Sequence, residues 1–467
     1  MITEAFPQLE SNAFVRLLRR YFSSTLHMIV VGVLTLLAAL LQWELPVYYC
    51  FFVLSVLAFF FGDDATGIVP VVCMGYASIS YENGPEKFPN TSVFYEGRFI
   101  VQTGFCLGVI LLLLFVRALF NLLSAEHPKA PRLWIGYVLL FAAYMLGGAF
   151  SKYYGKATVL FGFLNALLIS FFYFAFRYGV KWEERQKEYL FRVLSVLGAV
   201  ILAECLSMYF REGVVVNGVS NRGMLYMGWG SYNTVGCAMG MCAIAPLYFS
   251  VTKKHGWVFT ALSVAYMLGL FLTQSRGSIL FGTIAYVAAL VYMIIKSPKK
   301  ERIFSLIVIG VVVVAAAISM IFFADKLKTF FETLISAGTG DSGRKKLFKE
   351  AWNYFLSSPL FGVGWGGEWW ADGVNLFKFF MAHNTALQLL GSLGIFGTLA
   401  YLFHRVQTGV LVFKRPSVEK SIGAFVILAL LLMGMMDVHF FSCDLAAVLY
   451  PVILAFMEGS EFQKSSL

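Results

Sequence analysis

The chain has 467 residues, of which 59% are hydrophobic and 13% are charged, whereas soluble domains contain about 45–50% apolar and about 25% charged residues. Together with a mean hydropathy of +0.76, this composition excludes a soluble enzyme and indicates an integral membrane protein. The net charge of +10 would favour nucleic-acid binding in a soluble protein, but here we assign it to basic loops on the cytoplasmic side of a membrane.

Apolar runs of helical length follow one another along the whole sequence. Because lipid tolerates only structures that satisfy their own backbone, we predict an all-α polytopic membrane protein. Several runs are shorter than the roughly 20 residues of a perpendicular span, so we expect about 12–14 transmembrane helices, some of them tilted or re-entrant. The candidate spans are residues 25–41, 46–61, 66–80, 98–120, 133–149, 157–179, 189–210, 231–250, 256–274, 277–295, 303–323, 383–404, 421–438 and 441–458.

The loops between these runs predict a topology. Lys and Arg are concentrated in loops that would face the cytoplasm by the positive-inside rule, at 181–187, 252–256, 296–302 and 404–420. The external face then collects the polar segments 81–97, 211–230, 274–277 and 324–382. Both termini come out cytoplasmic if the weak run at 66–80 is counted as a span.

Four basic side chains fall near this external face: Arg222, Arg276 at a tight hairpin tip, Arg344 and His383. An arginine near lipid often marks a substrate path, and its planar fork suits phosphate oxygens. A histidine can act as a base or donate to phosphate. The alternatives left open are snorkelling to lipid headgroups for the arginines and helix capping for His383. Asn384 could orient His383 or cap the following helix.

The long polar loop contains three further features. Residues 342–356 form a basic amphipathic segment that we expect to lie at the membrane interface, as an anchor or as a grip on an anionic lipid. A glycine-rich turn follows, without the preceding strand of a nucleotide-binding loop, and its amides could be exposed near a sugar diphosphate. Trp365, Trp369 and Trp370 could stack on sugar rings or belong to an interfacial aromatic belt.

The second half of the chain carries a recognisable order of motifs: Asn-Arg-Gly at 221–223 with Tyr-Asn-Thr-Val-Gly at 232–236, Thr-Gln-Ser-Arg-Gly-Ser at 273–278, the loop segments 344–352 and 359–366, and His-Asn at 383–384 with Gly-Ile-Phe-Gly at 394–397. Through these motifs, residues 215–410 resemble the O-antigen ligase / O-antigen polymerase (Wzy, WaaL-like) superfamily of bacterial membrane glycosyltransferases. Members often carry a Glu shortly before the closing Gly-Ile-x-Gly, where this chain has Leu-Gly-Ser-Leu at 390–393. A carboxylate base would have to come from Glu350, Glu368 or Asp372, and the sequence does not choose among them.

The resemblance implies a GT-C-like fold and glycosyl transfer on the external face of the bacterial cytoplasmic membrane. The donor would be an oligosaccharide on undecaprenyl diphosphate, and the acceptor another lipid-linked glycan, lipid A core or another surface molecule. The protein would therefore be a polymerase or a ligase of O-antigen, capsule or exopolysaccharide. The implied catalytic residues are His383, Arg276 and Arg222, and the implied substrate-binding residues are Arg344, Asn384 and Trp365. Neither a cofactor nor a metal site is expected, because cationic side chains can stabilise a diphosphate leaving group.

Three regions follow from this resemblance. They are N-terminal transmembrane helices at 1–210, a ligase/polymerase-like core at 211–410 with its external loop at 324–382, and C-terminal transmembrane helices at 411–467. The expected partners are the lipid-linked donor, the acceptor, the bilayer and polysaccharide-assembly proteins, but no nucleic acid.

Two other classes of function are kept as alternatives. A polytopic transporter or flippase of lipid-linked glycans fits the number of spans, but it predicts two similar halves, and the sequence shows no such repetition. A cell-wall polymerase of the shape-and-division type would carry an essential acidic residue in its large loop. The His-Asn pair at 383–384 points away from that class.

Overall fold

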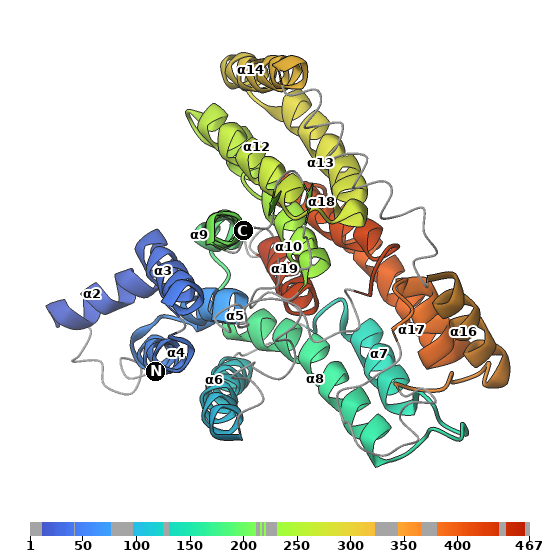
Figure 1. The fold of residues 1–467 in the computed structure, drawn as a ribbon. Coiled ribbons are helices and arrows are strands. Elements are labelled where there is room, and N and C mark those ends of the chain that lie inside the picture. Colours follow the sequence, from blue (N-terminus) through green and yellow to red (C-terminus); the bar gives the residue numbers. More distant parts are fainter. Residues whose placement is uncertain are drawn as a thin grey trace.

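The computed structural model describes residues 12–41, 43–75, 97–124, 130–211, 215–216, 219–220, 231–322, 344–365, 381–438 and 445–462. Within these ranges the fold is helical apart from one short antiparallel hairpin, in which β1 (Val215–Val216) pairs with β2 (Val219–Ser220). Figure 1 shows these helices gathered into one bundle. The predicted all-α class is confirmed.

Among the described residues, seven helical segments are long and apolar enough to cross a membrane, or eight if the bent pair α2 and α3 counts as one span. The seven are α6 (Gly97–Ser124), α8 (Lys156–Gly179), α9 (Glu184–Arg211), α10 (Tyr232–Ile244) together with α11 (Leu247–Thr252), α13 (Arg276–Lys296), α14 (Lys299–Phe322) and α17 (Thr385–Phe413). The remaining helices are α2 (Ala13–Phe22), α3 (Thr25–Leu41), α4 (Glu44–Phe61), η2 (Ala65–Ile68), α5 (Val69–Gly75), α7 (Trp134–Leu146), α12 (Gly256–Leu272), α16 (Arg344–Ser357), α18 (Val418–Met433) and α19 (Leu445–Phe462). The chain is a multi-pass membrane protein.

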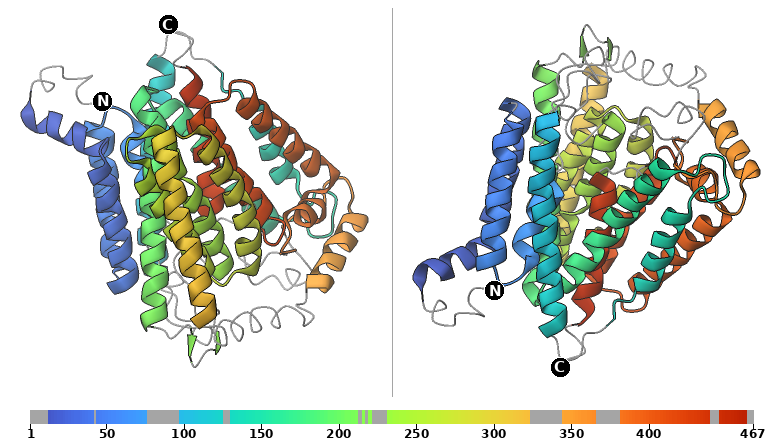
Figure 2. Two further views of the ribbon diagram at one scale, coloured as in Figure 1. Left: turned by 90° about the horizontal axis from the view of Figure 1, so that it is seen from above. Right: turned by 90° about the horizontal axis from the view of Figure 1, so that it is seen from below.

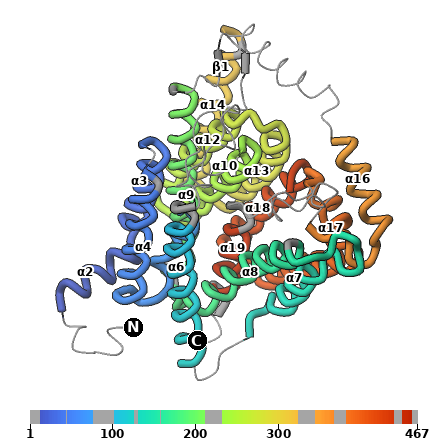
Figure 3. Tube along the Cα trace, turned by 60° about the horizontal axis from the view of Figure 1, so that its bottom comes forward, coloured from blue at the N-terminus to red at the C-terminus, as the bar shows by residue number. Residues whose placement is uncertain are grey.

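The broken helix α10–α11 lies at the centre of the bundle and α14 at its edge. In the most apolar part of Tyr232–Thr252, 89% is buried inside the protein, whereas the corresponding figure for α14 is 6%. In Figure 1, α2 to α6 lie on one side of this centre, α12 to α14 on a second, and α7, α8, α16 and α17 on a third. Side views show the hairpin β1–β2 at the end of the bundle opposite α2 (Figure 2). The tube in Figure 3 shows α16 alongside α17.

Several helix ends in the structure differ from the predicted boundaries. The predicted bounds of the loop at 404–420 are wrong, because α17 continues to Phe413 and α18 begins at Val418, which leaves 414–417 between the two helices. The guanidinium of Arg405, inside this extended helix, lies 4.4 Å from the ring centroid of Tyr401 and 4.3 Å from that of Tyr450. These cation–π contacts stabilise the charged side chain between helices. The weak run at 66–80 is helical from Ala65 to Gly75, as η2 and α5.

A break in α17 is closed by the glycine-rich turn of the long loop. Gly394 has φ 63° and ψ −159° inside the helix, which frees backbone groups that lipid cannot satisfy. The turn at 359–364 supplies the missing partners: Val363 N donates to Gly391 O (2.9 Å), Gly364 N to Ser392 O (2.9 Å) and Ile395 N to Pro359 O (2.8 Å). The interpretation of this turn as one with exposed amides is therefore wrong for Val363 and Gly364.

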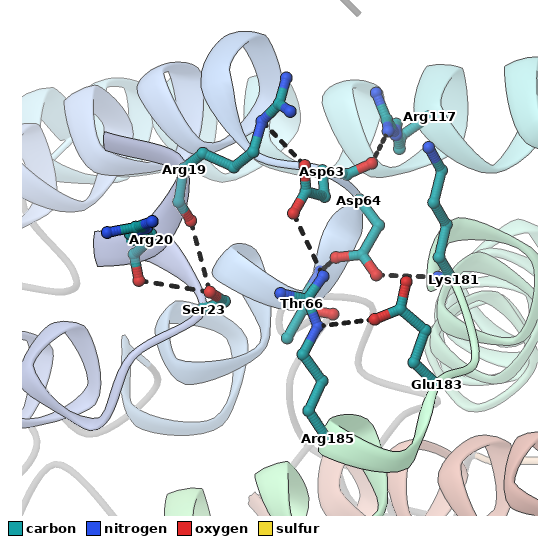
Figure 4. Close-up of polar contacts among 10 residues, drawn as sticks. All are labelled: Arg19, Arg20, Ser23, Asp63, Asp64, Thr66, Arg117, Lys181, Glu183 and Arg185. Atoms are coloured by element: carbon teal, nitrogen blue, oxygen red, sulfur yellow. Dashed lines mark hydrogen bonds and ion pairs between the residues drawn. The ribbon is translucent and has the colours of Figure 1, made fainter. Parts of the chain in front are cut away.

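Charged side chains tie the N-terminal helices together at the end of the bundle where α9 begins. Asp63, after α4, pairs with Arg19 of α2 at 2.8 Å and with Arg185 of α9 at 3.1 Å, as Figure 4 shows. Arg185 also pairs with the exposed Glu183 at 3.0 Å. Three helices are thus linked through one carboxylate.

A second carboxylate, Glu458 of α19, is completely buried. It pairs with Arg177 Nε of α8 at 3.3 Å, accepts the Arg132 backbone N–H at 2.8 Å, and accepts the hydroxyl of Tyr173. Because a buried charge is tolerated only when it is paired and hydrogen-bonded, these contacts fasten α19 to α8.

Candidate functional site

A hydrogen-bond network joins four segments that are distant in the sequence: the starts of α10 and α13, the residues before α17, and the turn after α18. Asp437 of that turn is at its centre. Nδ1 of His383 lies 2.9 Å from Asp437 Oδ1. Asn233 Nδ2 donates to Asp437 Oδ2 at 2.7 Å, and the Val438 backbone N–H donates to Oδ1 at 2.9 Å.

These contacts select the tautomer of the neutral imidazole. An ionised carboxylate only accepts hydrogen bonds, so Nδ1 of His383 carries the proton that faces Asp437. In that tautomer of the neutral ring, Nε2 has a lone pair and can accept a proton. The side chain of His383 is 34% exposed and that of Asp437 12%. The imidazole is therefore accessible, while the carboxylate that contacts it is largely shielded.

Ser275 connects this pair to the corner between α12 and α13. Its hydroxyl donates to Asn233 Oδ1 at 2.8 Å and lies 2.9 Å from Ser278 Oγ. Because Asn233 donates through Nδ2 to Asp437 and accepts through Oδ1 from Ser275, the two contacts agree on one orientation of the amide. The series Ser275–Asn233–Asp437–His383 is continuous.

The backbone beside the network is held in an uncommon conformation. His383 has φ 48° and Gln274 has φ 54°, a left-handed region that residues other than glycine seldom adopt and that often occurs at functional sites. The next residue, Asn384, caps α17, since its Oδ1 accepts the Leu387 N–H at 3.0 Å. Its Nδ2 donates to Met435 O at 2.8 Å. Asn384 thus fixes both the helix start and the turn that carries Asp437.

Arg276 lies next to this network as the first residue of α13, where it is half-buried. The adjacent Gly277 lets α13 approach the turn after α18, because a Cβ at that position would lie 2.7 Å from Met436 Cβ. The structure therefore brings the Arg276 corner and His383 together.

The other predicted arginines are placed differently. Arg344 is the half-buried first residue of α16, and Arg222 falls outside the described residues. α16 buries Ala351 and Tyr354 and exposes Lys345, Lys346 and Lys349, so the helix is amphipathic as the sequence predicts.

Trp365 belongs to the core of the bundle. Its side chain is 0% exposed, and its ring centroid lies 5.0 Å from that of Tyr144 and 5.8 Å from that of Phe161. The indole faces are covered by α7 and α8 rather than open to a sugar. The position of Trp365 is therefore explained by packing in the core.

An apolar groove of about 780 Å³ runs from the network along α17 and α18. Thr385 and Met435 bound it at the network end, and Phe413 and Pro416 at the other. The hydroxyl of Thr385 donates to Asp437 O at 3.2 Å, so the groove begins beside the proposed base. Volumes of this order are typical of ligand sites.

Sequence reasoning did not select Asp437, Asn233 or Ser275 as site residues. Asn233 and Ser275 lie inside the motifs on which the resemblance rests. Asp437 ends the apolar run at 421–438 on the same predicted face as His383, and an acidic residue at the end of a span is the signal that would have found it.

The structure describes Glu350 among the three carboxylates that the sequence offers as a base. Glu350 accepts the hydroxyl of Tyr354 at 2.9 Å within α16. Glu368 and Asp372 fall outside the described residues.

Comparison with known proteins gives one finding on family. Residues 261–402 match a family model described as O-antigen ligase, Wzy_C, whereas no curated protein matches the chain. The matched segment includes Ser275, Arg276 and His383 but neither Asn233 nor Asp437. The resemblance to the O-antigen ligase and polymerase superfamily is confirmed by the match over residues 261–402.

Proposed function

We propose that the chain is a membrane glycosyltransferase that moves or polymerises an undecaprenyl-diphosphate-linked oligosaccharide on the external face of the bacterial cytoplasmic membrane. The observation that carries this proposal is the continuous series Ser275–Asn233–Asp437–His383, which holds a proton acceptor beside the Arg276 corner. The O-antigen ligase match supports a transferase of the ligase and polymerase type.

The proposed reaction begins when Nε2 of His383 takes the proton of the acceptor hydroxyl. The hydroxyl oxygen bonds to the anomeric carbon of the donor sugar while the bond from that carbon to the diphosphate oxygen breaks. The diphosphate leaves with the bonding electron pair. Asp437, 2.9 Å from Nδ1, stabilises the imidazolium that forms.

Cationic side chains would receive the leaving diphosphate. Arg276 is the first candidate because it adjoins Ser275 of the network, and Arg222 and Arg344 are the others. A planar guanidinium can donate two hydrogen bonds to one phosphate group and stabilise the charge that develops on it. Independence from metal ions and cofactors remains a prediction.

The apolar groove between α17 and α18 is an argument for a lipid-linked donor. A prenyl chain along this mostly hydrophobic lining would stay in apolar surroundings within the membrane, and its diphosphate would then lie near Thr385, two residues after His383. The observed groove and the network therefore suit the two parts of one substrate.

The alternative function is a transporter or flippase of lipid-linked glycans, which the O-antigen ligase match does not favour. Ligase and polymerase differ in what a deletion strain would accumulate. Unpolymerised single repeats indicate a polymerase, and intact polymer left on its carrier lipid indicates a ligase.

The substitution His383→Asn tests the proposed base. Asparagine tolerates the left-handed backbone found at this position, φ 48°, so the variant removes the imidazole without new backbone strain. We expect transfer from an undecaprenyl-diphosphate-linked donor, measured in vesicles that contain the purified protein, to fall about 10²–10⁴-fold.

The matched control is His255→Asn. His255 is exposed, has φ 60° and precedes α12, a whole helix away from the Ser275 corner. This variant should retain full activity. A folded His383→Asn protein that transfers glycan within about twofold of the unchanged chain would contradict the base assignment.

A further inference from the structure

A second apolar groove lies between α3 and α12, with α9 as its floor. Its volume is about 770 Å³, and Figure 1 shows α9 between the two other helices. Ile29 and Val33 of α3 line it and are 46% and 49% exposed. α3 packs closely on α9, because a Cβ at Gly32 would lie 3.0 Å from Val196 Cγ1. The groove is thus open along the membrane-facing surface of the bundle.

Basic side chains gather at one end of this groove. Arg192, Lys253 and Lys254 line it, and Lys254 is exposed. One carboxylate lies among them: Glu188 Oε2 is 2.5 Å from Arg192 Nη2, and Lys253 pairs with Oε1 of the same group. A second carboxylate, Glu301, accepts the backbone N–H of His255, the residue after Lys254, at 3.2 Å. Three cations against these two carboxylates still leave this end positively charged.

This basic end is remote from His383. Gln274, in the corner beside the network, donates through Nε2 to the hydroxyl of Tyr209 at 2.8 Å, so the C-terminal part of α9 lies at the network end. Arg192 precedes Tyr209 by 17 residues of the same helix, which corresponds to about 25 Å. A diphosphate held at His383 cannot also reach the basic end of this groove.

The groove is about as long as one membrane leaflet is deep. Its lining on α3 extends from Thr25 to Leu36, about 16 Å of helix, and half of a bilayer core is about 15 Å. Tyr189 donates to Phe22 O at 3.3 Å, which places the start of α3 beside the start of α9. The basic residues therefore lie at the Thr25 end, with the apolar channel leading away from them.

We propose that this groove binds an anionic phospholipid, with its phosphate at Arg192, Lys253 and Lys254 and its acyl chains along α3 and α12. Basic pockets between transmembrane helices are suited to anionic headgroups. A zwitterionic lipid would cover the same apolar surface without the gain from net positive charge. The site does not depend on the proposed transferase function.

Lipid titration of the purified full-length protein tests this proposal. Phosphatidylglycerol and phosphatidylcholine with identical acyl chains are added in detergent, and bound lipid is counted by native mass spectrometry. We expect tighter binding of phosphatidylglycerol. Lys254→Ala should weaken it about fivefold, the effect of one basic side chain near an anionic headgroup, and leave phosphatidylcholine unchanged. The control Lys300→Ala, at an exposed position in the first turn of α14 and outside the groove, should alter neither.

Two further variants separate binding from folding. Glu188→Gln removes the carboxylate from the basic end and should tighten phosphatidylglycerol binding severalfold, which a loss of folding cannot do. Val33→Trp should fill the channel and abolish binding, whereas Val314→Trp, at a 57% exposed position of α14, should leave it intact. Equal affinities for the two lipids, or equal effects of Lys254→Ala and Lys300→Ala, would overturn the proposal.

Discussion

At the scale of single residues, the two nitrogens of one imidazole take different roles because of one contact. Nδ1 of His383 faces a carboxylate oxygen at 2.9 Å, and Nε2 faces away from that partner. The carboxylate is held in turn by Asn233 and by the Val438 N–H. In the proposed reaction, Asp437 would therefore act through His383, as a positioning residue.

The substitution Asp437→Asn should lower kcat about 10²-fold or more while KM for the donor changes little. The amide keeps the shape of the side chain but removes the negative charge that stabilises the imidazolium. Steady-state transfer kinetics in vesicles give this measurement. Asp437→Ala should also lower the thermal midpoint, because Asn233 and Val438 would lose their acceptor. A fall in donor affinity as large as the fall in kcat would argue against the positioning role.

At the scale of elements, α17 consists of two helical halves that are held together by hydrogen bonds from the turn at 359–364, which we call the brace. The break at Gly394 needs a positive φ of 63°, and the turn at 359–364 supplies backbone partners on both sides of it. The first half of α17 carries the network and the start of the apolar groove. The long loop thus contributes to the site by fixing the helix that follows it.

We predict that Gly394→Ala destabilises the protein by about 1–3 kcal/mol, since alanine is strained at this φ. The added Cβ would also lie 2.6 Å from Gly362 N, inside the brace. Thermal unfolding in detergent would show the loss, with a parallel fall in transfer. The control is Gly310→Ala in α14, where nothing lies within 4 Å of an added Cβ. Equal midpoints for the two variants would refute the brace.

At the scale of the whole molecule, charges link helices that are distant in the sequence. Glu458 and Arg177 join α19 to α8 across 281 positions of the chain. Their side chains are 0% and 8% exposed, whereas those of Glu183 and Arg185 are 55% and 46% exposed. The N···O distances of the two pairs are similar, at 3.3 Å and 3.0 Å. The pairs therefore differ in burial and not in the distance between their charges.

The buried pair should therefore matter far more to stability than the exposed one. Glu458→Gln should cost about 3 kcal/mol, because it leaves the charge of Arg177 buried without its counter-charge. Glu183→Gln should change stability by less than about 1 kcal/mol. Chemical unfolding of both variants in the same detergent measures the difference. Similar losses in the free energy of unfolding for the two variants would contradict this prediction, because they would mean that burial does not strengthen the Glu458–Arg177 pair.

The sequence by itself determined the class of the molecule and the residues of its second half that resemble a known family. Apolar runs report on lipid locally, so a multi-pass helical protein follows from composition alone. The motifs at 273–278 and 383–384 are also local, and the O-antigen ligase match contains both.

Only the tertiary structure decided which side chains meet. Asp437 is 54 positions from His383 and 204 from Asn233, and no local pattern couples them. The packing of α10, α13, α17 and α18 does, because each of these helices brings one end to the same place. The same packing buries Trp365 and occupies the amides of the glycine-rich turn, since a broken helix in lipid must find its hydrogen-bond partners inside the protein.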